Sequence, residues 1–193
     1  MQRILTAGLA GGIAAWMWGF LVWVALGVHL PAIHKFADEG AVQAALAAAD
    51  GNDTPGLYWV PGMNHSPDMT KEEMTAAQEV WMDKATEGPY ALVYLHPTGV
   101  NARSLNYLWV GLLLEVCAAT LAAWLLALAC AGEPLSYFKR VAFVAGLGIF
   151  ASIVAPILGW NFMHFPTEWT LHLVFDHVTT WTVAGLAIAW RIR

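Results

Sequence analysis

The chain has 193 residues, of which 59% are hydrophobic and 12% are charged, with 11 tryptophans and a formal net charge of −5. A soluble domain is usually about 25% charged, so this composition excludes an ordinary soluble domain and indicates an integral membrane protein. The charge is unevenly spread, because residues 31–104 hold ten of the fourteen acidic residues and four of the nine basic ones.

Residues 1–30 form the first apolar segment. The run is longer than the roughly 7–15-residue core of a signal peptide, so we interpret it as a transmembrane helix. Small residues recur along it at spacings of four, three and four. Such a stripe lets another helix approach closely, and we expect it to be a helix-packing face. Its members are Gly8, Gly12, Ala15 and Gly19.

The polar stretch 31–104 predicts a small mixed α/β cap outside the membrane. Asp38 is a typical N-cap for a helix over residues 39–49. Thr70-Lys-Glu-Glu73 has the capping-box pattern and predicts a second helix over residues 70–85.

Two β-prone runs between turn signals complete the predicted cap. They predict short strands over residues 56–60 and 90–96 that can pair with each other. Aromatic side chains are expected to pack the core of this small unit and to seat it on the bilayer surface. They are Tyr58, Trp59, Trp81, Tyr90 and Tyr94.

Three more apolar segments follow, so the fold class is an all-α membrane protein, a four-transmembrane-helix bundle with the cap attached. Pro156 is expected to kink the third helix. The predicted spans and their connecting loops are residues 105–131, 132–140, 141–161, 162–168 and 169–193.

Basic residues near the helix ends predict the orientation. With four spans, all of those outside the cap fall on one side: Arg3, Lys139, Arg140, Arg191 and Arg193. The positive-inside rule then puts both termini and the 132–140 loop in the cytoplasm. The chain is expected in a bacterial inner membrane, with residues 31–104 and the 162–168 loop on the periplasmic side.

The predicted spans contain a set of ionisable residues. Each costs roughly 2.5–3.5 kcal/mol at the centre of a bilayer, unless it faces protein, water or a ligand. His172 and Asp176 are four apart and share a helix face, and His177 lies about 100° round from Asp176. Glu115 lies roughly 15 Å below the outer loop. We expect Glu115, His172, Asp176 and His177 to converge at one depth.

Several interpretations of this polar cluster remain open. It can be a satisfied buried network that specifies helix register. It can be a metal site formed by His172, Asp176 and His177 with His164. It can be a proton relay, or a lone histidine can ligate a haem or another pigment.

Several short motifs add a resemblance that covers most of the chain. These are Gly8-Leu-Ala-Gly-Gly12 with Trp18-Gly19, Pro55-Gly-Leu-Tyr58, Pro61-Gly-Met63, Gly88-Pro-Tyr90 and His96-Pro-Thr-Gly99. With them the chain resembles a group of small bacterial inner-membrane proteins that share four predicted spans and a long first outer loop. The motifs are turn and packing signals, so the resemblance implies an architecture and no site residues.

The sequence contains no phosphate-binding loop, no ordered Ser/His/Asp set and no zinc-protease helix motif. The acidic cap disfavours nucleic acid as a partner. We therefore expect a non-catalytic accessory or structural subunit of a larger membrane complex, for example an energy-transducing one. It would contact lipids and a protein partner or a second copy, through the small-residue stripe or the cap. The alternative is a metal-binding or proton-relay protein that uses the polar cluster.

Overall fold

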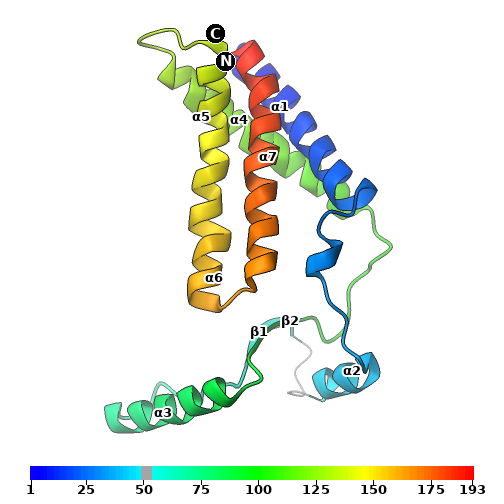
Figure 1. The fold of residues 1–193 in the computed structure, drawn as a ribbon, viewed down its shortest axis with the longest axis vertical. Helices are drawn as coiled ribbons and strands as arrows, with labels where there is room; N and C mark the ends of the chain where they lie inside the picture. Colours follow the sequence, from blue (N-terminus) through cyan, green and yellow to red (C-terminus); the bar gives the residue numbers. More distant parts are fainter. Residues whose placement is uncertain (49–53) are drawn as a thin grey trace. The chain divides into compact units, whose positions relative to one another are not determined.

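A computed structural model describes residues 1–48 and 54–193 of the chain (Figure 1). Among these residues, four helices are long and apolar enough to cross a membrane, which confirms the predicted number of candidate spans. They are Gln2–Ala25, Asn106–Ala129, Tyr137–Met163 and Thr167–Arg191. The chain forms two compact units. We call Met1–His34 with Arg103–Arg193 the transmembrane unit, and Lys35–Ala102 the cap.

The first span is shorter than the predicted 1–30 segment. It consists of α1 (Gln2–Phe20) and the π-helical turn η1 (Leu21–Ala25). The helix ends there because Gly27 adopts a left-handed conformation, with φ of 58°, which glycine reaches without steric cost. After this reversal the chain makes one 3-10 turn, η2 (Leu30–Ala32), and enters the cap.

The other spans lie close to their predicted ranges. The second is α4 (Asn106–Ala129), and the fourth is α7 (Thr167–Arg191). The third begins at Tyr137, inside the predicted 132–140 loop, because the Ser136 hydroxyl caps the helix by accepting a hydrogen bond from the Lys139 N–H. The expected break at Pro156 takes the form of a π turn. This span consists of α5 (Tyr137–Ser152), η3 (Ile153–Ile157) and α6 (Leu158–Met163).

The small-residue stripe of α1 packs against α4 of the same chain. A Cβ atom added at Gly12 would lie 2.5 Å from the Val116 Cα, and one added at Gly8 would collide with Thr120. Ala15 is 1% exposed. Gly19 differs, because nothing lies within 4 Å of an added Cβ atom there. The structure therefore gives Gly8 and Gly12 a helix partner within the chain, and contact of the stripe with a partner protein stays a prediction.

The helices pack in the order α4, α1, α7 and α5, so that α1 lies between α4 and α7. Figure 1 shows that the two termini and the α4–α5 loop lie at the same end of the unit. The apolar core of the helices lies in the half nearest that end. Small side chains dominate this core and allow the close helix approach. Its buried members are Ala7, Ala15, Ala119, Ala122, Ala123, Leu126, Val144, Ala184, Ile188 and Ile192.

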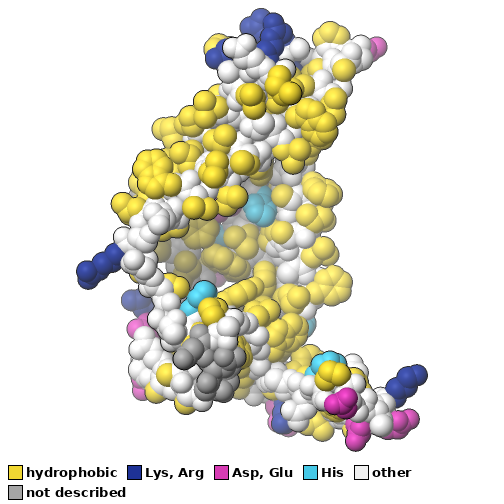
Figure 2. All heavy atoms as spheres, turned by 180° about the vertical axis from the view of Figure 1, so that it is seen from behind, with side chains coloured by type: hydrophobic (Ala, Val, Ile, Leu, Met, Phe, Trp, Pro, Cys, Tyr) yellow, Lys and Arg dark blue, Asp and Glu magenta, His cyan; other side chains and the backbone are white. Residues whose placement is uncertain are grey.

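The same end of the transmembrane unit is basic. Figure 2 shows Lys and Arg side chains gathered there, while hydrophobic side chains cover much of the visible helix surface. Arg140 donates hydrogen bonds to the carbonyls of Ala189 (3.1 Å) and Leu135 (2.5 Å). A cation at the carboxyl end of α7 also complements the helix dipole. Arg140 thus fastens α5 to α7.

The cap contains α2 (Glu39–Ala47), β1 (Gly56–Val60), α3 (Lys71–Glu87) and β2 (Ala91–Leu95). The strands pair antiparallel, with Gly56 opposite Leu95 and Val60 opposite Ala91. This confirms a small two-stranded sheet. The predicted end of the first cap helix at residue 49 lies outside the described residues.

The cap has no buried side chain among its described residues, 35–48 and 54–102. Trp59 contacts the rings of Trp81 and Tyr90, at centroid distances of 6.4 and 6.1 Å. Tyr94 is 72% exposed, so its predicted place in a core is wrong. It lies on the opposite face of its strand from Val93, because side chains alternate. Local contacts hold these described parts of the cap together, and they do not enclose a core.

Candidate functional site

The site begins with the chain reversal after the first span. The left-handed Gly27 turns the backbone so that His29 folds back beneath Trp23. The two rings stack with centroids 3.8 Å apart and planes within 4° of each other. His29 is 1% exposed. An imidazole is thus buried at the end of the first span that lies opposite the termini.

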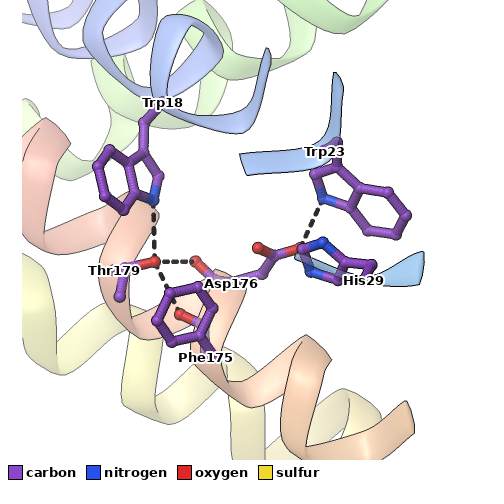
Figure 3. A network of polar contacts seen from close by, with 6 residues as sticks. All are labelled: Trp18, Trp23, His29, Phe175, Asp176 and Thr179. Atoms are coloured by element: carbon purple, nitrogen blue, oxygen red, sulfur yellow. Dashed lines mark hydrogen bonds and ion pairs between the residues drawn. The ribbon is translucent and has the colours of Figure 1, made fainter. Parts of the chain in front are cut away.

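Asp176 of α7 faces this stacked pair (Figure 3). Its Oδ2 atom accepts a 2.7 Å hydrogen bond from the Trp23 Nε1–H. The Nε2 atom of His29 lies 2.9 Å from the same oxygen, at ion-pair distance but outside hydrogen-bond geometry. The other oxygen, Oδ1, is buried without a hydrogen-bond partner among the described residues. Asp176 therefore has one satisfied and one unsatisfied oxygen.

A second contact fastens α1 to α7 one turn further in. The Trp18 Nε1–H donates a 2.9 Å hydrogen bond to the Thr179 hydroxyl, which donates to the Phe175 carbonyl at 2.8 Å (Figure 3). Trp18 and Trp23 would lie about 140° apart on a regular α-helix. The π turn over Leu21–Ala25 widens the helix, and residues five apart then approach the same face. Both indoles can therefore reach α7.

A cavity of about 390 Å³ lies beside this network, between α1, α4 and α7. Glu115, Asp176 and His177 are in its wall. The face of the unit shown in Figure 2 is hollowed in its middle, and a histidine side chain is visible there. Five aromatic side chains also line the cavity: Trp16, Phe20, Trp23, Tyr107 and Trp181.

Two titratable groups of the wall lack partners. Glu115 is partly buried and makes no hydrogen bond or ion pair with any residue in the described ranges. The Nδ1 atom of His177 is buried and has no hydrogen-bond partner there either. An unpaired charge on a buried side chain costs several kcal/mol. Each of these two groups must therefore be neutral or be paired with a ligand of opposite charge.

The structure brings three of the four predicted cluster residues to the cavity. Glu115, Asp176 and His177 line it, whereas His172 lies beside His29, with ring centroids 5.3 Å apart. His172 is one helical turn closer than Asp176 to the amino-terminal end of α7. The four residues therefore do not all lie at one depth, because His172 is outside the cavity wall and one turn further along α7.

The residues of the predicted metal set do not share one centre. His164 ends α6 in a left-handed conformation, with φ of 55°, and lines a different surface pocket with Trp160 and Phe165. In the part of the chain that the structure describes, no three His, Cys, Asp or Glu side chains are placed to hold a metal ion. The metal site stays a prediction without geometric support.

Sequence reasoning missed the partners of Asp176. The sequence shows His29 two residues after Gly27 at the end of the first span, and the indoles of Trp18 and Trp23 within that span. The spacing of five between the indoles obscured their common target, because it does not fit a regular α-helix.

Comparisons with family models, with curated proteins and with solved structures found no match to this chain.

Proposed function

We propose that this chain is a multi-pass membrane protein that takes up and passes protons at the polar cluster of its outer half. The observation that carries the proposal is the buried contact between Asp176 and His29, which adjoins a cavity holding the unpaired Glu115. Buried carboxylates and imidazoles inside membrane spans are the groups that proton pathways use.

The titratable side chains form a series in which each lies next to the following one, as a proton pathway requires. His172 lies nearest the outer end, His29 lies against it, and Asp176 lies against His29. Asp176 and Glu115 then share the cavity wall. A proton held on the His29 imidazole makes an ion pair with Asp176. A turn of the imidazole that points its Nε2–H at Oδ2 would let the proton pass to the carboxylate, which leaves both groups neutral. Trp23 donates to Asp176 in either state, because its N–H cannot accept a proton.

The proposed orientation places both termini in the cytoplasm of a bacterium and the cap on the periplasmic side. The grouping of basic residues at the end of the transmembrane unit that carries the termini supports it. With this orientation, His172 and His29 lie toward the periplasmic face and the cavity lies deeper.

Proton flux into liposomes that contain the full chain tests the proposal. We expect a pH-sensitive dye inside the vesicles to respond at least about tenfold more slowly with Asp176→Asn than with the wild type. Asparagine keeps the acceptor for Trp23 and removes the titration. Glu168→Gln, an exposed acid in the first turn of α7, is the matched control and should behave as the wild type. Equal flux in wild-type and Asp176→Asn vesicles would contradict the proposal.

A second candidate is the accessory subunit of a membrane complex, which the cap favours. The cap exposes large hydrophobic side chains while enclosing no buried one among its described residues. A unit with a two-stranded sheet and no core is marginal alone. Contact with another protein, or with a second copy, would cover these side chains. The most exposed are Phe36, Tyr94 and Val100.

The mass of the protein in mild detergent tests this candidate. Light scattering should give a complex heavier than one chain plus its micelle, and the double change Phe36→Ser with Val100→Ser should reduce it. The matched control is Phe138→Ser, because Phe138 is also strongly exposed but lies on α5 of the transmembrane unit. A single chain at every protein concentration would remove the support for a subunit role.

A further inference from the structure

The wall of the cavity combines negative and aromatic groups. Glu115 and Asp176 supply carboxylates, and five aromatic rings surround them. No lysine or arginine is among the described residues that line it. Aromatic faces attract cations through their quadrupoles, most strongly where water is excluded, and aromatic cages hold quaternary ammonium groups. The wall therefore suits a positive charge carried on an apolar body.

We infer that this cavity binds a small organic cation, a quaternary or protonated amine with an apolar substituent, and that Glu115 is its counter-ion. Glu115 has no partner within the described ranges, whereas one oxygen of Asp176 already accepts from Trp23 and contacts His29. Phe20 and Tyr107 are 46% and 64% exposed, so they form the mouth of the cavity.

An inorganic cation fits the same wall poorly. Calcium takes six to eight oxygen ligands, and magnesium needs nearly ideal octahedral geometry. The cavity offers two carboxylates and mostly aromatic surface. Its volume of about 390 Å³ is at the lower end of the range for ligand sites, roughly 300–1,000 Å³, which suits a ligand with one ring or a short alkyl group.

The cation competes with protons for the same carboxylates, and this part of the inference rests on the proposed function. The titratable groups in the cavity wall or next to it come from α4, from α7 and from the turn after the first span. They are Tyr107 and Glu115 of α4, His172, Asp176 and His177 of α7, and His29 after the first span. The charged residues of α1 and α5 lie at the opposite end. Protonation of a carboxylate removes the charge that attracts the cation, and an imidazolium repels it, so binding weakens as pH falls.

Phenyltrimethylammonium is a suitable probe, because its charge is permanent and tert-butylbenzene is its neutral isostere. Equilibrium dialysis against the full chain in detergent, with empty micelles as the blank, measures binding of each. We expect saturable binding of the cation that is at least about tenfold weaker at about pH 5 than at about pH 8. The isostere should bind with no such pH dependence.

Two pairs of variants locate the site. Glu115→Gln should weaken cation binding at least about tenfold, whereas Glu133→Gln, an exposed acid in the α4–α5 loop, should not. Phe20→Leu should weaken it about two- to fivefold, and Phe150→Leu, exposed on α5, should leave it unchanged. The Phe20 pair decides the matter if Glu115→Gln does not fold.

Equal binding of the isostere and the cation, or loss of affinity in neither Glu115→Gln nor Phe20→Leu, would overturn the inference. Its failure is separable from that of the proposed function. Proton flux that depends on Asp176 without cation binding would leave the proton role standing alone. Cation binding that depends on Glu115, without proton flux, would support the cation site and contradict the proton role.

Discussion

The transmembrane unit and the cap are stabilised in different ways. In the transmembrane unit, α1 approaches α4 closely enough that Gly8 and Gly12 have no room for a Cβ atom, and ten buried apolar side chains form a core. In the cap, the described residues include no buried side chain. Hydrogen bonds at helix starts, one ladder of two strands and the Trp81 contact hold it.

This difference indicates that the cap depends more than the transmembrane unit on its surroundings for stability. Close packing of small side chains gives the transmembrane unit contacts that persist in detergent or lipid. Local hydrogen bonds each contribute about 0.5–1.5 kcal/mol and do not add up to a cooperative fold without apolar burial. We therefore expect the two units to respond to mutation separately and with different magnitudes.

The largest effect is expected where α1 meets the backbone of α4. Gly12→Ala should lower the stability of the transmembrane unit by an amount near the upper end of roughly 1–3 kcal/mol, because the added methyl group meets the backbone of Val116. Gly19→Ala, in the same helix with open space around it, should change stability by less than about 0.5 kcal/mol. Thermal unfolding in detergent measures both. Equal effects would mean that close packing does not set the stability of this unit.

Asp176 provides the next largest expected effect. Asp176→Ala leaves the Trp23 N–H without its acceptor and should cost about 1–2 kcal/mol in the same assay. Asp176→Asn keeps an acceptor oxygen and should cost less. If both variants lose the same stability, the negative charge of Asp176 matters more than its hydrogen bond, and the ion pair with His29 would be the main contact.

Local signals in the sequence predicted much of the fold. Hydropathy gave the four spans, and the side chains of Asp38 and Thr70 marked the starts of both cap helices, because capping is decided within three residues. The strand over residues 56–60 matches β1, and the second differs by one residue at each end. These features depend on neighbours in sequence.

The rest depends on contacts between distant residues. Counting residues predicted that Glu115 and Asp176 lie near each other, and both line the cavity, but the approach of His29 to Asp176 needs the left-handed Gly27 and the π turn before it. Neither has a reliable sequence signal. The small-residue stripe was visible, but its partner was not, because any helix with a compatible surface could have packed there.

In the cap, Trp81→Phe removes one contact between α3 and the end of β1. The Trp81 Nε1–H donates a 3.0 Å hydrogen bond to the Pro61 carbonyl. Its loss should destabilise the cap by about 0.5–1.5 kcal/mol and leave the thermal unfolding of the transmembrane unit unchanged. Amide hydrogen exchange of α3 measures the first quantity. Trp109→Phe, exposed on α4, is the control, and a change in both units would show that they are coupled.

The smallest expected effect is the pH response of the first turn of α3. The pKa of Glu73 lies below its ordinary value of 4.5, because the backbone N–H and then the hydroxyl of Thr70 donate hydrogen bonds to its carboxylate. A lowered pKa in the folded state means that the ionised form stabilises this turn. The stabilisation is complete above about pH 4.5 and is lost as pH falls through the lower, folded value.

Thr70→Ala tests this assignment, because it removes the hydroxyl bond and should raise the pKa of Glu73 toward its ordinary value, as followed by NMR titration of the Glu73 carboxyl group. Thr75→Ala is the control, since that hydroxyl donates to the Lys71 carbonyl and does not touch Glu73. An unchanged Glu73 pKa in Thr70→Ala would show that the backbone N–H alone holds the carboxylate. The cap would then depend even less on its side chains than the comparison with the transmembrane unit implies.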